Sequence, residues 1–134
     1  MRTGETASLR YLKQFIEIKQ LGKGFIKYKD GRPLINTSDK LNAKKAFDYS
    51  LDRIKNGDFD LIILDEIINL LNFNLITIND IKELINKRPE GSCVILTGSN
   101  APVELIDIAD TVTEMKEIKH VFKKGITAKE GIEY

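Results

Sequence analysis

Short apolar runs divide the chain at regular intervals and predict its strands. "FDLIIL" (59–64) and "SCVILTG" (92–98) are nearly continuous apolar runs, the pattern of strands buried on both faces of a sheet. "FIEIK" (15–19) alternates apolar and polar residues and predicts a short strand, and "TVTEM" (111–115) predicts a last one. "LGKGFIKYKDGRP" (21–33) is rich in glycine and lysine and predicts a loop.

Helical spacing fills the segments between these runs. From Ser38, a candidate N-cap, apolar residues recur at helical spacing until Gly57, which predicts a helix with one buried stripe. A second helix is predicted over 77–89, because Thr77 and Asp80 have capping-box spacing and Pro89 ends the pattern. "NAPVELIDIAD" (100–110) predicts a short third helix. The stripe of the first helix comprises Ala43, Phe47, Leu51 and Ile54.

Helices that alternate with apolar strands predict an α/β fold. We expect a mostly parallel sheet with helices on both faces, within a single domain over residues 1–134. Ligands of such sheets bind beyond the carboxyl ends of the strands. That rule selects Asp65-Glu66 after one strand and Thr97–Asn100 after the next, and we expect both at the same edge of the sheet.

Composition narrows the class of protein. Hydrophobic residues make up 42% of the chain and charged residues 31%, as in a soluble globular protein. A formal net charge of +1 gives no reason to expect nucleic acid. No apolar stretch approaches the roughly 20 residues that span a bilayer, and the polar N-terminus does not resemble a secretory signal. We therefore expect a cytoplasmic protein, with its single Cys93 reduced and buried in a strand.

Asp65 and Glu66 are the first candidate for chemistry. Carboxylates at the end of a strand, beside nucleotide phosphates, can hold Mg²⁺ and so neutralise charge on a leaving polyphosphate. The alternative is that the two acids only begin the next helix, where negative charge favours the positive end of the helix dipole.

Three weaker candidates each have a purely structural alternative. The turn Thr97–Asn100 could bind an anion with its backbone amides, or could use glycine only to turn from strand to helix. "GKGF" (22–25) lacks the G-x-x-x-x-G-K-[ST] spacing of a phosphate loop, which occurs nowhere in the chain. With Phe25 and Tyr28 it could form a lid for a flat ligand, or an ordinary turn. His120, the only histidine, is expected to be a surface residue.

Taken together, these segments resemble the P-loop type of ATP:corrinoid adenosyltransferase, also called cob(I)alamin adenosyltransferase. The resemblance covers about residues 4–134 and rests on "TGE", "GKGF" and "GDFDLIILDEI", and most specifically on "RPEGSCVILTGSNAPVELIDIADTVTEMKEIKH" and the terminal "KKGITAKEGIEY". It implies a P-loop NTPase-like (RecA-like) fold.

The resemblance also implies a reaction of cobalamin biosynthesis or salvage. Such enzymes transfer the 5′-deoxyadenosyl group of ATP to the cobalt(I) of a reduced corrinoid and release tripolyphosphate, with Mg²⁺ as cofactor. Cobalt(I) is the nucleophile, so no activated Ser or Cys is needed. The implied partners are a second copy of the chain, in a homodimer, and a reductase that delivers cobalt(I).

Site roles follow from the resemblance position by position. The acids match the magnesium-side carboxylates, and the corrinoid-binding positions lie in the glycine-lysine segment and in the turn after the second buried strand. The chain departs from the family at two of these positions. Lys27, followed by Tyr28, stands where relatives often have Trp, and Ser99 stands where many have Arg. The implied residues are Asp65 and Glu66 for catalysis and Mg²⁺, and Phe25, Lys27, Tyr28, Thr97, Gly98 and Asn100 for the corrinoid.

The missing phosphate loop is the third departure. In the family it lies on the first strand, roughly fifty residues before "TGE", so the sequence predicts a chain that lacks this strand and loop and is truncated at its N-terminus. Losing even one well-placed donor to a triphosphate can cost on the order of 3 kcal/mol. The alternative function is therefore a non-catalytic corrinoid-binding or interaction module that has lost ATP chemistry.

Overall fold

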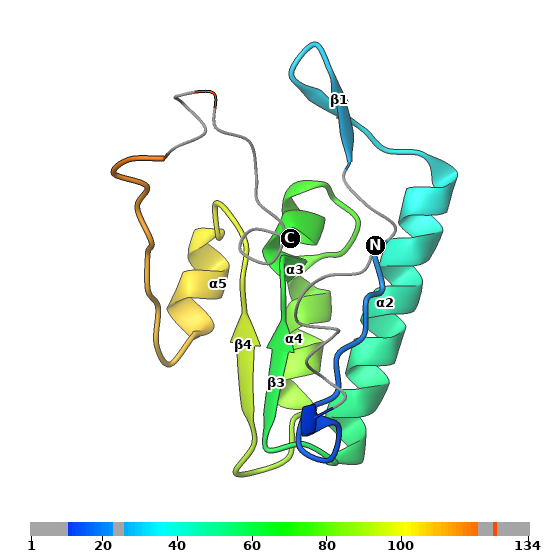
Figure 1. Cartoon of the computed structure of the whole chain (residues 1–134), viewed down its shortest axis with the longest axis vertical. Helices are drawn as coiled ribbons and strands as arrows, with labels where there is room; N and C mark the ends of the chain where they lie inside the picture. The colour runs from blue at the N-terminus through cyan, green and yellow to red at the C-terminus, as the bar shows by residue number, and fades with distance from the viewer. Residues whose placement is uncertain (1–10, 23–25, 121–124, 126–134) are drawn as a thin grey trace. The chain divides into compact units, whose positions relative to one another are not determined.

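The computed structural model describes residues 11–22, 26–120 and 125 (Figure 1). The chain divides into two compact units, one of residues 1–20 and 112–134, the other of residues 21–111. The second unit contains every helix and strand discussed below, while the single domain over residues 1–134 stays a prediction. Its elements are β1 (Lys27–Lys29), β2 (Arg32–Leu34), α2 (Thr37–Asn56), β3 (Leu61–Leu64), α3 (Ile67–Asn72), α4 (Ile78–Asn86), β4 (Cys93–Leu96) and α5 (Val103–Ile108).

The two apolar runs form a parallel pair of strands. β3 and β4 lie side by side, with Leu61 opposite Cys93 and Leu64 opposite Leu96. Helices α3 and α4 lie between them in the chain, as a parallel connection requires. The α/β fold with a parallel sheet is therefore confirmed.

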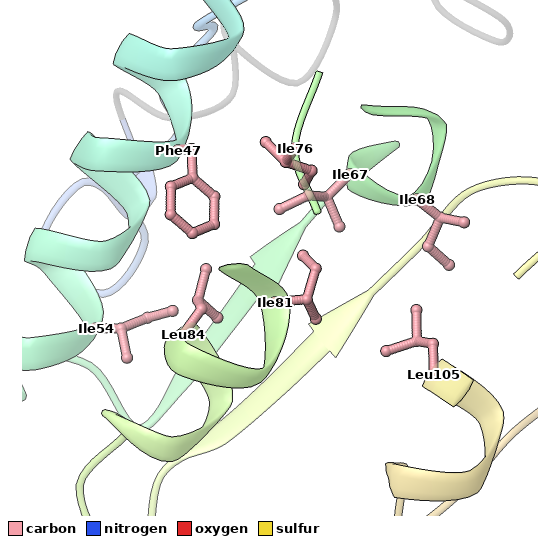
Figure 2. Close-up of a cluster of buried hydrophobic side chains, with 8 residues drawn as sticks. All are labelled: Phe47, Ile54, Ile67, Ile68, Ile76, Ile81, Leu84 and Leu105. Carbon is pink, nitrogen blue, oxygen red and sulfur yellow. The ribbon is translucent and has the colours of Figure 1, made fainter. Parts of the chain in front are cut away.

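One face of this sheet meets the helices in a single hydrophobic core. Figure 2 shows side chains from α2, α3, α4 and α5 converging on this core, and Ile62, Leu64, Val94 and Leu96 of the two strands pack against it. Three of its side chains have almost no exposed surface, which makes them the centre of the core: Ile54, Ile81 and Leu84.

The other face of the same two strands is exposed. Side chains alternate across a strand, and Leu61, Ile63 and Ile95 are about half exposed. The prediction of strands buried on both faces, with helices on both sides, is therefore wrong for the described part of the chain. Cys93 lies on this face and is a free, exposed thiol, so its predicted burial is also wrong.

Capping defines the two longer helices. The predicted N-cap of α2, Ser38, is wrong: the N-cap is Asn36, two residues earlier, which forms a reciprocal capping box with Asp39. The helix ends at Gly57, whose φ of 69° suits glycine. α4 begins after Thr77, whose side chain accepts a hydrogen bond from the backbone N–H of Asp80, so the predicted box is confirmed.

Three predictions of local structure are wrong. The segment 21–33 was expected to be a loop, but β1 and β2 pair as an antiparallel hairpin over residues 27–34. Asp30 and Gly31 have φ of 50° and 74°, the two positive angles that a tight two-residue hairpin turn needs. Residues 15–19 and 111–115 form no strand, and no described strand pairs with either segment. Alternation without a neighbour does not make a stable strand.

No helix among the described residues is both long enough and apolar enough to cross a membrane.

Candidate functional site

The carboxyl ends of β3 and β4 bring Asp65, Glu66 and Thr97 together. The backbone N–H of Thr97 donates to the carbonyl of Leu64 at 3.2 Å, which extends the sheet by one bond. The Thr97 hydroxyl then donates to Oδ1 of Asp65 at 2.7 Å and accepts from the backbone N–H of Glu66 at 2.8 Å. The predicted meeting of these two loops at one edge of the sheet is confirmed.

Glu66 has a strained backbone. Its φ of 60° lies in the left-handed region, which costs a residue with a Cβ roughly 1–2 kcal/mol. Besides the bond from Glu66 to the Thr97 hydroxyl, the N–H of Ile68 donates to the Thr97 carbonyl at 3.1 Å. Non-glycine residues in this region concentrate at functional sites when surrounding contacts over-determine them.

The helix-start interpretation of the two acids fits the position of Glu66, which is the N-cap residue of α3. Its side chain makes no capping hydrogen bond to the backbone. Its Oε2 accepts a hydrogen bond from Nδ2 of Asn69, a residue of the same helix.

Two asparagines of α3 bind the turn that follows β4. The N–H of Ser99 donates to Oδ1 of Asn69 at 3.2 Å, and Nδ2 of Asn72 donates to the Ser99 carbonyl at 2.7 Å. The sequence interpretation missed both asparagines. Their only signal is spacing, since Asn69 and Asn72 follow Glu66 at intervals of three residues, which places the three on one side of a short helix.

Gly98 lets the turn approach α3 closely. Its φ is 142°, and a Cβ there would lie 2.7 Å from Cβ of Ile68 and 3.3 Å from the backbone nitrogen of Asn69. The N–H groups of Thr97 and Ser99 already have partners within the chain. These contacts favour the structural interpretation of the Thr-Gly turn over an anion nest.

A depression of about 430 Å³ lies beside the turn. Its lining is neutral, with amides, a hydroxyl and one aromatic ring: Asn69, Asn72, Phe73, Ser99 and Asn100. Asn72 also lines a second depression of about 390 Å³, which extends to Thr77 and Glu104. Of the three turn residues predicted to meet the corrinoid, Thr97, Gly98 and Asn100, only Asn100 lines either space. The two acids lie outside both.

The donor set at the strand ends suits a hard cation. In the described part of the chain, no group of three or more His, Cys, Asp or Glu side chains is placed to hold a metal ion. Mg²⁺, however, needs only one or two carboxylates when water and substrate phosphates complete its shell. Asp65 and Glu66 are both exposed and present oxygen ligands, and a carboxylate bound at one oxygen retains further acceptor capacity. The residues present therefore fit Mg²⁺.

The remaining predicted site residues stay untested. Phe25 and the side chains of Lys27 and Tyr28 lie outside the part of the chain that the structure describes; the backbone of the latter two belongs to β1. Their corrinoid-binding roles stay predictions. His120 is exposed, as expected of a surface residue.

The described unit, with two acids after one parallel strand and a polar turn after its neighbour, belongs to the broad class of α/β proteins. Within that class, the chain belongs to the ATP:corrinoid adenosyltransferase family, because the family described as ATP:corrinoid adenosyltransferase BtuR/CobO/CobP matches residues 1–134. The resemblance seen in the sequence is thereby confirmed.

Individual relatives carry the same name. The chain is 34% identical over 138 residues to a corrinoid adenosyltransferase of Sinorhizobium sp., which covers all of this chain and 62% of the relative. It is 32% identical over 132 residues to the enzyme of Pseudomonas aeruginosa, covering 98% of this chain and 63% of the relative. The corrinoid adenosyltransferase of Escherichia coli K12 is 27% identical over 97 residues. The chain thus spans less than two thirds of the length of these relatives.

Proposed function

We propose that the protein transfers the 5′-deoxyadenosyl group of ATP to the cobalt(I) of a reduced corrinoid and releases tripolyphosphate. Membership of the family supports the reaction class. The observation that carries the proposal for this chain is the Thr97 hydroxyl, which joins the Asp65 carboxylate to the backbone of Glu66 at the end of the sheet.

Asp65 and Glu66 are the residues that would hold Mg²⁺. When bound, the ion neutralises negative charge on the leaving polyphosphate. Thr97 holds the Asp65 carboxylate in one orientation through its 2.7 Å hydrogen bond, so that no rotation of that side chain is needed when substrate arrives. We assign Thr97 a positioning role for this reason.

The turn Thr97–Asn100 and the adjacent depression are the proposed corrinoid side of the site. Cobalt(I) is itself the nucleophile, so the protein needs to orient two substrates and exclude water rather than activate a side chain. A neutral lining of amides and a hydroxyl can hydrogen-bond the polar periphery of a corrin. Phe25, Lys27 and Tyr28 complete this side in the proposal, through the family resemblance alone.

Other parts of the proposal rest on the family resemblance and the sequence. They are a RecA-like arrangement of the complete sheet, a homodimer, a reductase that delivers cobalt(I), and a cytoplasmic location.

Corrinoid binding without catalysis is the alternative function carried over from the sequence analysis. In that case the turn and the depression would bind a corrinoid while ATP chemistry is absent.

One assay separates the two functions. The purified chain is mixed anaerobically with ATP, Mg²⁺ and chemically reduced cobalamin, and the absorbance change of cobalt–carbon bond formation is followed. The proposed activity predicts product, and Asp65→Asn and Glu66→Gln should each lower its rate at least about tenfold. Asp107→Asn, an exposed acid of α5, is the matched control and should leave the rate unchanged.

Binding is measured in parallel, by spectral titration with the corrinoid alone. Corrinoid binding without product would support the non-catalytic module. Product formed equally well by wild type, Asp65→Asn and Glu66→Gln would contradict the proposed role of the two acids.

A further inference from the structure

We propose that Asn69 is a positioning residue that couples the Glu66 carboxylate to the backbone of the turn after β4. The inference rests on the proposed function for the role of Glu66. The juxtaposition itself does not, because it is made of contacts within the chain.

A single amide group makes both contacts. Nδ2 of Asn69 donates to Oε2 of Glu66, and Oδ1 of the same side chain accepts the N–H of Ser99 at 3.2 Å. Both bonds require the same orientation of the amide. A flipped amide would set NH₂ against the Ser99 N–H and its carbonyl against the carboxylate.

The amide makes the strength of one hydrogen bond depend on the other. When an N–H of a carboxamide donates to a carboxylate, the carbonyl oxygen of that carboxamide becomes a stronger acceptor, because hydrogen bonds in a chain polarise one another. The negative charge of Glu66 therefore strengthens the bond between Asn69 and Ser99. Neutralising Glu66, through a bound cation or by substitution, weakens it.

The geometry around the amide leaves the turn little freedom to follow another path. Asn72, one turn further along α3, holds the carbonyl of Ser99 at 2.7 Å. Gly98 lies so close to α3 that a Cβ there would meet Ile68 at 2.7 Å. The turn is thus seated on α3 at three successive points, and only the contact through Asn69 also reaches an acid.

The consequence is that a cation bound on the metal side affects the corrinoid side of the site. A cation that occupies Glu66 loosens Ser99, which lines the neutral depression proposed for the corrinoid. Asn69 thereby links the metal side of the site to the corrinoid side within one side chain.

Amide hydrogen exchange at Ser99, followed by NMR on the chain without substrate or metal, tests the coupling directly. Asn69→Leu removes both bonds at similar volume, and we expect the protection of the Ser99 amide to fall about fivefold, the effect of one ordinary hydrogen bond. Glu66→Gln should lower the protection by a smaller factor in the wild-type background and by nothing in the Asn69→Leu background.

Asn72→Leu is the matched control, an asparagine of the same helix that contacts Ser99 but not Glu66. In that background the effect of Glu66→Gln on Ser99 should persist.

Two results would overturn the inference. Unchanged Ser99 protection in Asn69→Leu would show that the bond is not made, and an effect of Glu66→Gln that survives Asn69→Leu would reduce Asn69 to a structural role. Because neither readout uses ATP or a corrinoid, an inactive chain in the adenosylation assay leaves this test intact.

Discussion

The hydroxyl of Thr97 lies 2.7 Å from Oδ1 of Asp65 and joins the end of β4 to the end of β3. The two residues are 32 positions apart in the chain, yet they follow directly on residues that are paired in the parallel sheet, Leu64 and Leu96. The same oxygen accepts the N–H of Glu66 at 2.8 Å. One hydroxyl thus orients the side chain of Asp65 and holds the strained backbone of Glu66.

Replacing Thr97 by valine removes this hydroxyl without changing the volume of the side chain much. We expect Thr97→Val to weaken divalent cation binding about tenfold, as loss of a partner that orients a metal ligand does. Mn²⁺, which shares the preference of Mg²⁺ for carboxylate and water oxygens, can be titrated by electron paramagnetic resonance. Thr97→Ser keeps the hydroxyl and should bind Mn²⁺ like wild type. Equal affinities of the valine and serine variants would show that the hydroxyl does not position the acids.

Gly98 offers a second test of how the turn is seated on α3. Gly98→Ala places a Cβ 2.7 Å from Cβ of Ile68, in a backbone conformation of φ 142°. The overlap should lower the free energy of unfolding by about 1–3 kcal/mol, measured by urea denaturation. Gly91→Ala is the control, because Gly91 also has a positive φ, of 84°, but open space around its Cβ position. A smaller loss at Gly98 than at Gly91 would contradict the close contact.

Local signals in the sequence correctly predicted features that depend on residues close together in the chain or on the geometry of paired strands. The capping box of Thr77 and Asp80 was confirmed, and so was the stop of α2 at Gly57. The rule that strand ends share an edge correctly brought Asp65 and Thr97 together. Each of these follows from spacing along the chain or from the geometry of a parallel pair.

Predictions that depend on a distant partner were less successful. An apolar run indicates that both faces of a strand are suited to burial, but covering them requires other elements, and Ile63 is 57% exposed. Residues 15–19 alternate correctly, yet no described strand pairs with them. Asn69 was missed because an asparagine in a helix is an ordinary surface residue until its contacts with Glu66 and Ser99 are seen.

The reactivity of the Cys93 thiol tests whether it is exposed, as in the structure, or buried, as the sequence predicts. Its position on the uncovered face of β4 makes the sulfur accessible to reagents. A maleimide should therefore label the native protein at a rate close to that of the protein in urea, measured by mass spectrometry. Strong protection of the native thiol would show that this face of the sheet is covered in solution.

The two faces of the β3–β4 sheet should also differ in what they contribute to stability. Ile81, on α4 in the core, has 0% exposed surface, whereas Ile63 on the other face of β3 is 57% exposed. Ile81→Ala should lower the free energy of unfolding by about 2–5 kcal/mol, because it removes buried methylene and methyl groups and leaves a cavity. Ile63→Ala makes the same chemical change where much of the side chain already meets water, so its cost should be roughly 1 kcal/mol. Urea denaturation of both variants, monitored by circular dichroism, gives the two values under identical conditions. Equal losses would mean that the exposed face buries Ile63 against a partner in solution, and a loss that grows with protein concentration would identify that partner as a second copy of the chain.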